Sequence, residues 1–239
     1  MWEPVTLGMS GARVQRRPGV YRKFTQDADV EARALSWLRL QGLPAAEVLD
    51  VGADWLLTRE VQGRGAADPW PAGDLDRVVD ALAEVTRALH VLPAESCPFD
   101  RTLSVTVPEA RAAAKEGRVD LANLDPERQG WDAPRLVREL EWLLPAAQAA
   151  EDVVVTHGDW CLPNILLDPQ TIEVVGIVDA ARAGRAGRCM DLALMNRSLR
   201  SAHLNPQYGP ARAERYLARC GANDAADKLA FYELLDEFF

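Results

Sequence analysis

The stretch at residues 152–179 constrains the fold and the chemistry of this chain more than any other segment. Two apolar runs, at 153–155 and 165–167, flank a polar loop that contains His157, Asp159 and Asn164. The second run leads into turn-forming residues at 168–171 and then into a third apolar run at 174–178, which ends beside Asp179. Short apolar runs bounded by turn residues predict strands, and the turn predicts a β-hairpin. The returning strand would bring Asp179 back to the loop.

These three oxygen-bearing side chains have the chemistry that phosphoryl transfer requires. A carboxylate such as Asp159 orients an attacking hydroxyl and accepts its proton. Magnesium ions prefer oxygen ligands, which Asn164 and Asp179 offer. Taken alone, an Asp five residues before an Asn is most often a loop cap, and His157 alone is more often structural than catalytic. The combined pattern is more restrictive, and it predicts a site for phosphate and magnesium.

The remaining sequence predicts two regions of different character. Residues 1–60 have the pattern of short strands around one helix, with strands at 5–7, 13–17, 20–24, 48–51 and 55–61 and the helix at 27–41. Residues 64–73 resemble a loop, and helices then dominate, at about 75–91, 108–117, 133–145, 189–202, 210–220 and 224–238. The layout predicts an α+β fold with a small antiparallel-sheet N-lobe at 1–60, a larger, mainly helical C-lobe at 61–239 and a hinge near 58–63.

The charge of the chain favours some partners and disfavours others. Its 239 residues include 36 acidic and 27 basic side chains, for a net charge of −9. Nucleic-acid binding requires clustered Lys and Arg, so we expect no nucleic-acid partner. An acidic surface attracts a cationic ligand over a long range, although acidity also serves solubility alone.

The sequence also predicts where the protein resides. It has no uninterrupted apolar run of about 18 residues and no basic-then-apolar leader, so we expect neither a membrane span nor secretion. The four cysteines lie far apart, which is typical of reduced thiols in a cytoplasmic protein.

The chain resembles the aminoglycoside phosphotransferases, most closely the 3′-phosphotransferase group, whose fold is similar to that of protein kinases. The resemblance spans nearly the whole chain and is carried by residues 35–38, 97–100, 124–130, 157–164, 179–185, 191–194, 197–198 and 231–239. The motif at 157–164 is shared by many small-molecule kinases, whereas the C-terminal segment is more particular. The resemblance implies a two-lobed, protein-kinase-like fold that transfers phosphate from ATP or GTP to an aminoglycoside hydroxyl, with the 3′ position expected. We expect a monomer or a weak dimer.

The resemblance assigns roles at the reaction centre. Asp159 matches the catalytic carboxylate, and Asn164 and Asp179 match the ligands of Mg²⁺. Lys23 matches the lysine that contacts the nucleotide α- and β-phosphates, and Glu31 matches the helix acid that pairs with it. Glu31 also opens a predicted helix, where a carboxylate suits the dipole, so a solvated first-turn acid is the alternative.

Four further residues match the nucleotide side of the family. Ser10 lies in a loop with two glycines that matches the segment covering the phosphates, although an ordinary hairpin turn explains two glycines equally well. Tyr21 falls where relatives place an aromatic ring against adenine, and a strand tyrosine packed on its neighbours is the alternative. The segment from Thr58 to Val61 matches the hinge whose backbone pairs with adenine.

The substrate side requires anions, because aminoglycosides carry several ammonium groups. The resemblance places two acids and the terminal carboxylate near the chain end, one acid in a substrate loop, and two arginines near the site: Asp236, Glu237, Phe239, Asp125, Arg182 and Arg197. The arginines would position phosphate or carboxylates, with a structural ion pair as the alternative.

Two departures and two alternatives complete the prediction. Ala181 stands where the family usually has glycine, and only seven residues separate Lys23 from Glu31. A kinase of the same fold acting on a sugar, an amino alcohol or a macrolide is one alternative function. The other is a non-catalytic relative that binds nucleotide or drug without turnover.

Overall fold

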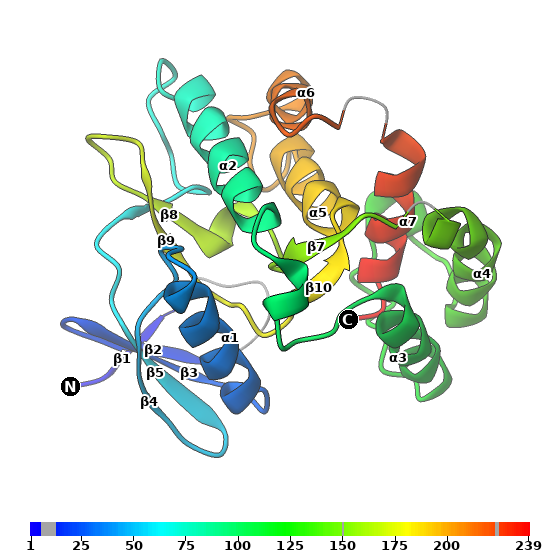
Figure 1. The fold of residues 1–239 in the computed structure, drawn as a ribbon, viewed down its shortest axis with the longest axis horizontal. Coiled ribbons are helices and arrows are strands. Elements are labelled where there is room, and N and C mark those ends of the chain that lie inside the picture. Colours follow the sequence, from blue (N-terminus) through cyan, green and yellow to red (C-terminus); the bar gives the residue numbers. More distant parts are fainter. Residues whose placement is uncertain (6–12, 150, 223–224) are drawn as a thin grey trace.

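The computed structural model describes residues 1–5, 13–149, 151–222 and 225–239 (Figure 1). The N-terminal region is a five-stranded antiparallel sheet in the order β1-β2-β3-β5-β4. Its strands are β1 (Glu3–Val5), β2 (Val14–Arg17), β3 (Val20–Phe24), β4 (Val48–Val51) and β5 (Trp55–Arg59). Helix α1 (Ala28–Leu40) packs on β4 and β5 through small and apolar side chains such as Ala32, Leu35 and Leu38. The small antiparallel sheet with one helix was predicted.

The larger region is built from six helices and two small sheets in the described residues. The helices are α2 (Leu75–His90), α3 (Leu103–Lys115), α4 (Ala133–Ala149), α5 (Cys189–Arg200), α6 (Pro210–Arg219) and α7 (Ala226–Asp236). Helix α5 packs against both α6 and α7, and α4 packs against α7 and α3 (Figure 1). Buried apolar side chains from all these helices form one continuous core. The two-region α+β architecture is therefore confirmed.

The predicted hairpin is present and supplies two strands of a three-stranded sheet in the order β6-β8-β9. Strand β8 (Ile165–Leu167) pairs antiparallel with β9 (Val174–Ile177), and β8 also pairs with β6 (Arg64–Gly65). Asp168 closes the turn, because its Oδ1 accepts the backbone N–H groups of Gln170 at 2.8 Å and Thr171 at 2.9 Å. Strand β7 (Val153–Thr156) pairs instead with β10 (Gly184–Gly187), a strand that the sequence did not predict.

The two regions are joined by backbone hydrogen bonds as well as by the chain. The N–H of Ala46 donates to the carbonyl of Ile177, and the N–H of Ile177 donates to the carbonyl of Pro44, both at 2.9 Å. These bonds attach the segment after α1 to the end of β9. The connection fixes the N-terminal sheet directly against the strand that leads to Asp179.

Two predicted boundaries were wrong. Helix α3 begins at Leu103, five residues before the predicted start, and carries Pro108 inside it. Proline removes one helical hydrogen bond. The extra turn is stabilised because Leu103 and Val107 are buried and because the Glu151 carboxylate accepts the Leu103 N–H at 3.1 Å. The segment at 64–73, predicted as loop, contributes the short strand β6.

Candidate functional site

The loop after β7 brings the predicted catalytic residues together. The side-chain amide of Asn164 donates to the Oδ2 of Asp159 at 2.9 Å and to the Asp159 carbonyl at 2.8 Å. The N–H of Val178 donates to the Asn164 carbonyl at 3.0 Å, which holds the end of the hairpin against the loop. Asp179 follows directly. The hairpin therefore returns the backbone of Asp179 to the loop of Asp159 and Asn164, as the sequence predicts.

His157 fastens this loop to the end of the hairpin. Its Nδ1 accepts the backbone N–H of Asp159 at 3.3 Å, which assigns the ring proton to Nε2. Nε2 then donates to the Val178 carbonyl at 3.0 Å. The side chain is fully buried, so His157 has a structural role, which was the alternative favoured for a lone histidine.

Two backbone positions in the site have positive φ. Gly158 has φ +81°, and a Cβ atom there would lie 2.2 Å from the Arg182 carbonyl oxygen. Only glycine adopts a positive φ without strain and also leaves the space that a Cβ atom would occupy empty. Asp179 has φ +60°, which is uncommon for a residue with a side chain, although Asp tolerates it better than most. Such conformations cluster at functional sites because surrounding contacts must hold them.

Lys23 links the N-terminal sheet to this centre. Its ammonium donates to Glu31 Oε2 at 2.9 Å and also forms a short ion pair with Asp179. Burial opposes the charge on Lys23, but the carboxylates of Glu31 and Asp179 outweigh it and raise the pKa of the lysine. Burial also raises the pKa of Glu31, and Lys23 offsets part of that effect. The predicted Lys23–Glu31 pair is observed.

The donor set at this centre fits a magnesium ion. Because the Asn164 amide nitrogen faces Asp159, its carbonyl oxygen is directed elsewhere, and Asp179 retains a second carboxylate oxygen beyond the one bound by Lys23. Magnesium in phosphoryl-transfer sites takes one or two protein oxygens and completes its shell with phosphates and water. Over the described ranges there is no cluster of three or more His, Cys, Asp or Glu side chains suited to a metal.

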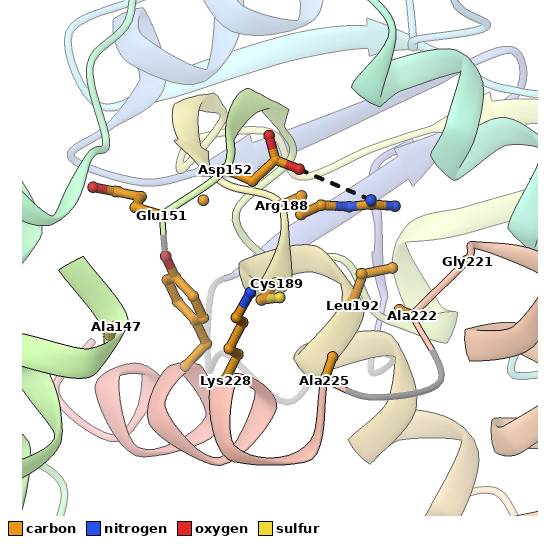
Figure 2. A pocket seen from close by; sticks show the side chains of 12 residues that line it. Ala147, Glu151, Asp152, Arg188, Cys189, Leu192, Gly221, Ala222, Ala225 and Lys228 are labelled. Atoms are coloured by element: carbon orange, nitrogen blue, oxygen red, sulfur yellow. Dashed lines mark ion pairs between the residues drawn. The ribbon is translucent and has the colours of Figure 1, made fainter. Parts of the chain in front are cut away.

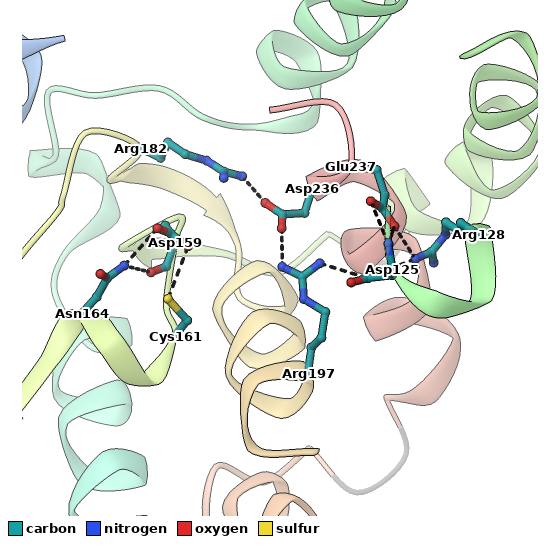
Figure 3. A network of polar contacts seen from close by, with 9 residues as sticks. All are labelled: Asp125, Arg128, Asp159, Cys161, Asn164, Arg182, Arg197, Asp236 and Glu237. Atoms are coloured by element: carbon teal, nitrogen blue, oxygen red, sulfur yellow. Dashed lines mark hydrogen bonds and ion pairs between the residues drawn. The ribbon is translucent and has the colours of Figure 1, made fainter. Parts of the chain in front are cut away.

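The acidic chain end is tied to arginines rather than free (Figure 3). Asp236 accepts ion pairs from Arg182 at 2.6 Å and from Arg197. Arg197 also contacts Asp125 at 3.0 Å, so one guanidinium bridges the chain end and the predicted substrate loop. Burial would raise the pKa of Asp236, but Arg182 and Arg197 outweigh it and lower that pKa.

A second arginine anchors the other acid of the chain end. Arg128 contacts Glu237 at 3.1 Å and Asp125 at 3.4 Å. Glu237 also accepts the backbone N–H of Asp125 at 3.1 Å. These acids are predicted from the sequence to be available to a cationic ligand, whereas in the structure three guanidiniums partly neutralise them. Arg182 and Arg197 both form ion pairs with Asp236, which agrees with the structural alternative given for these arginines.

The last residue lies beside the same network. Phe238 is buried, while Phe239 is about half exposed. The ring of Phe239 lies 5.3 Å from the Arg182 guanidinium and 5.8 Å from that of Arg101, within cation–π range. The chain end is therefore held next to the loop that carries Asp159.

Three of the predicted nucleotide-side residues, Tyr21, Lys23 and Thr58, lie on one face of the sheet. Tyr21 and Thr58 are register partners on β3 and β5, and Lys23 lies two residues along β3. Side chains two residues apart on a strand share a face, so Tyr21 faces the same way as the lysine that reaches Asp179. Val61 packs on β9, where a Cβ at Gly176 would lie 2.6 Å from it. Ser10 lies outside the described residues.

Two contacts that were not predicted from the sequence support the catalytic loop. Asp191, on α5, is fully buried and accepts the backbone N–H groups of His157 at 3.0 Å and Gly158 at 2.9 Å. Thr86 accepts the indole N–H of Trp160 at 2.7 Å. Helices distant in the sequence supply both contacts. Asp191 lies in the segment 191–194, which carries part of the family resemblance, but no role was assigned to it there.

A well-formed cavity lies away from this centre. It has a volume of about 340 Å³ and is enclosed by α4, α5, α7 and the segments around Asp152 and Gly221 (Figure 2). None of the predicted site residues lines it. Its charged side chains compensate one another, with Arg188 and Lys228 against Glu151 and Asp152.

Comparisons with known proteins identify the class to which this fold and site belong. The model of the phosphotransferase enzyme family matches residues 12–232, so the chain belongs to that family. The aminoglycoside 3′-phosphotransferase of Streptomyces fradiae is 44% identical over 258 residues, which cover 100% of this chain and 95% of the relative. The streptomycin 3″-kinase of Streptomyces griseus is 37% identical, over 98% of this chain and 91% of the relative.

Solved structures give the same result. The crystal structure of a type VIII aminoglycoside 3′-phosphotransferase matches with a TM-score of 0.89 and 43% identity, over 100% of this chain and 94% of that one. An aminoglycoside phosphotransferase of Streptomyces rimosus, in complex with ADP and streptomycin, matches with a TM-score of 0.84 and 32% identity, over 99% and 92%. The predicted family and kinase-like fold are confirmed. Every helix within the described ranges is too short or too polar to span a bilayer.

Proposed function

We propose that this protein transfers the γ-phosphate of ATP or GTP to the 3′-hydroxyl of an aminoglycoside and thereby confers resistance to the antibiotic. The observation that carries this proposal is the full-length similarity to the Streptomyces fradiae 3′-phosphotransferase, at 44% identity. The Asp159–Asn164 contact is a second, independent support. It holds a carboxylate beside an amide in one loop, and phosphoryl transfer requires such a carboxylate.

The roles of the residues follow from the chemistry of the site. Asp159 orients the attacking hydroxyl towards the γ-phosphate and accepts its proton. Lys23 binds the α- and β-phosphates while Glu31 holds its ammonium in place. The face of the sheet that carries Tyr21 and Thr58 covers the nucleotide base. Catalysis is then mostly positioning and charge neutralisation.

Asn164 and Asp179 hold Mg²⁺ together with the nucleotide phosphates. When bound, the ion neutralises the phosphate charge that develops during transfer. Lys23 binds Asp179 in the structure, so the same lysine fixes the carboxylate for the metal and the phosphates for the reaction.

The aminoglycoside occupies the space beside the arginine-bridged acids. Ammonium groups bind the carboxylate oxygens of Asp125, Asp236, Glu237 and the terminal carboxylate of Phe239, while Arg182 and Arg197 keep these acids in a fixed geometry. The acidic balance of residues 61–239 attracts the polycation over a long range. We further propose that the protein acts in the cytoplasm as a monomer or weak dimer.

A coupled assay of nucleotide consumption tests the function. Kanamycin should stimulate ATP or GTP consumption, and a 3′-deoxy kanamycin should not, because it lacks the acceptor hydroxyl. Replacing Asp159 by Ala should lower turnover by at least about 100-fold while nucleotide binding persists, since a positioned base contributes on that scale. Equal stimulation by the 3′-deoxy compound would refute the 3′ position, and near-normal turnover of the Asp159 variant would refute the mechanism.

A second candidate is phosphorylation of the 3″-hydroxyl of streptomycin. The 37% identity to the Streptomyces griseus 3″-kinase favours it over other kinase activities. The same assay with streptomycin decides between the two, because preference for streptomycin over kanamycin in kcat/KM would reverse the assignment.

A further inference from the structure

The cavity between α4, α5 and α7 contains a buried polar group without a partner (Figure 2). Tyr232 lines this cavity and is only 3% exposed, and its hydroxyl forms no hydrogen bond with any described residue. A Cβ atom at Gly187, another lining position, would lie 2.0 Å from this hydroxyl, so the polar end of the ring stands at the cavity wall. An unpaired buried hydroxyl is costly, and a bound acceptor would remove that cost.

The hydroxyl of Tyr232 is available as a donor. Burial raises the pKa of Tyr232, and the Glu151 carboxylate adds to this effect, so the hydroxyl keeps its proton at neutral pH. Glu151 itself accepts the backbone N–H of Leu103 at 3.1 Å. Figure 2 shows its carboxylate directed away from Lys228 and Cys189.

Lys228 brings a positive charge to the same cavity. It lies on the same face of α7 as Tyr232, because residues four apart on a helix are neighbours. Burial raises the pKa of the Cys189 thiol, and the Lys228 ammonium opposes this effect. The ammonium therefore acts on the cavity at the point where α5 begins (Figure 2).

The N-terminus of α5 supplies further donors. Gly187, Arg188 and Cys189 line the cavity, and Cys189 is the first residue of the helix. The first N–H groups of a helix have no acceptor within the helix, and the helix dipole places positive partial charge there. Such a helix end favours the binding of an oxyanion.

The remaining charged pair of the cavity is already engaged. The Arg188 guanidinium lies 3.9 Å from the Asp152 carboxylate, which is 64% exposed to solvent. Arg188 also donates to the Cys220 carbonyl at 2.7 Å. The groups left for a ligand are therefore donors: the buried hydroxyl, the Lys228 ammonium and the N–H groups at the start of α5.

We propose that this cavity binds a small organic anion, whose carboxylate or phosphate group is held by the Tyr232 hydroxyl, the Lys228 ammonium and the N-terminus of α5. The volume of about 340 Å³ lies at the lower end of the range for small-molecule pockets. The apolar side chains of Leu192, Ala222 and Ala225 also line the cavity, so the ligand carries a compact apolar body. The site shares no residue with the reaction centre.

Three small probes test the chemistry of the ligand in the full-length protein. Phenyl phosphate and benzoate carry the two oxyanion groups on one aromatic ring, and benzylammonium carries the opposite charge on the same ring. We expect at least one anion to shift the NMR signals of the Cys189 and Met190 amides with a Kd of about 1 mM or less. The anion with the lower Kd identifies the preferred group. Absence of a shift with both anions, or an equal shift with benzylammonium, refutes the proposal.

A matched pair of lysine variants separates this site from general electrostatics. Lys228→Gln should raise the Kd of the tighter anion about 10-fold, because a charge-assisted hydrogen bond is lost. Lys115→Gln removes the same charge from the exposed end of α3, outside the cavity, and should leave Kd within about 2-fold. Equal effects of the two variants would overturn the assignment.

Tyr232→Phe keeps the ring and removes only the hydroxyl. It should raise the Kd of the same anion about 5-fold, while the thermal midpoint of the free protein is unchanged or higher, because an unpaired buried donor is removed. An unchanged Kd, or a lower midpoint of the free protein, contradicts the role of this hydroxyl. These measurements need no turnover, so their outcome is independent of the proposed function.

Discussion

Replacing Gly158 by Ala tests how tightly the catalytic loop is confined. A Cβ atom at this position would lie 2.2 Å from the Arg182 carbonyl oxygen, and Cβ atoms essentially never approach closer than 3.0 Å. The loop or the Arg182 backbone must therefore separate by at least about 0.8 Å, the difference between 3.0 and 2.2 Å. A displacement of that size moves Asp159 by a comparable amount.

The loss of folding free energy in Gly158→Ala has two parts, the positive φ and the steric clash. Gly42 has the first without the second and therefore serves as the control. Gly42 has φ +87°, close to the +81° of Gly158, but no atom lies within 4 Å of its would-be Cβ. The positive φ alone costs about 1–2 kcal/mol for alanine, and the stiffer unfolded chain returns about 0.4–1 kcal/mol. Gly158→Ala adds an overpacking cost of about 1–3 kcal/mol. We expect it to lower the free energy of unfolding by about 2–4 kcal/mol, against about 1 kcal/mol for Gly42→Ala.

Urea unfolding and steady-state kinetics measure the two effects. Gly158→Ala should lower kcat by about 100-fold, because the carboxylate that orients the hydroxyl is displaced, while Gly42→Ala should leave kcat within about 3-fold. The reasoning would be refuted if the two variants lost equal stability and Gly158→Ala kept normal turnover.

Three further predictions concern packing, charge and metal. Replacing Thr86 by Val leaves the Trp160 indole N–H without its acceptor, so urea titration should show a loss of about 1–3 kcal/mol; an unchanged midpoint contradicts this. Replacing Asp236 by Asn leaves Arg182 and Arg197 without their shared anion and should cost about 3–5 kcal/mol at pH 7. Because the pKa of Asp236 is lowered in the folded protein, its contribution is complete above the unfolded pKa of about 3.9. The difference between wild type and Asp236→Asn should therefore shrink as the pH falls through the lowered pKa, and growth on acidification contradicts the ion pairs. Chelation with EDTA should abolish turnover and added Mg²⁺ should restore it; activity that persists without divalent ions refutes the proposed metal role.

The local elements were predictable because their signals are local. The turn at 168–171 was predicted from residues that form turns, and Asp168 closes it through its own side chain. The pairing of β8 with β9 follows from that turn, and with it the return of the chain to Asp159. The Lys23–Glu31 pair was expected from the resemblance, and the geometry agrees.

Contacts between distant segments were not predictable in the same way. Strand β10 has the sequence Gly-Arg-Ala-Gly, which has no strand pattern, and it forms because β7 offers a partner edge. The early start of α3 depends on Glu151, which is 48 residues away from Leu103. Such elements are stabilised by tertiary contacts that outweigh local preference.

The chain by itself determined which atoms are available for the chemistry: a carboxylate, an amide and a second carboxylate at spacings that a hairpin brings together. It also determined the family, because the residues at 157–164 and at the chain end carry a resemblance that the family match confirms. Only the tertiary structure decided the electrostatic state of those groups. Asp236 and Glu237 are held by arginines from α5, the loop after β9 and the segment before α4, and Asp191 is held by a histidine from α2. The physical reason is that Coulomb and hydrogen-bond energies depend on distance in space, which the order of residues along a chain does not specify.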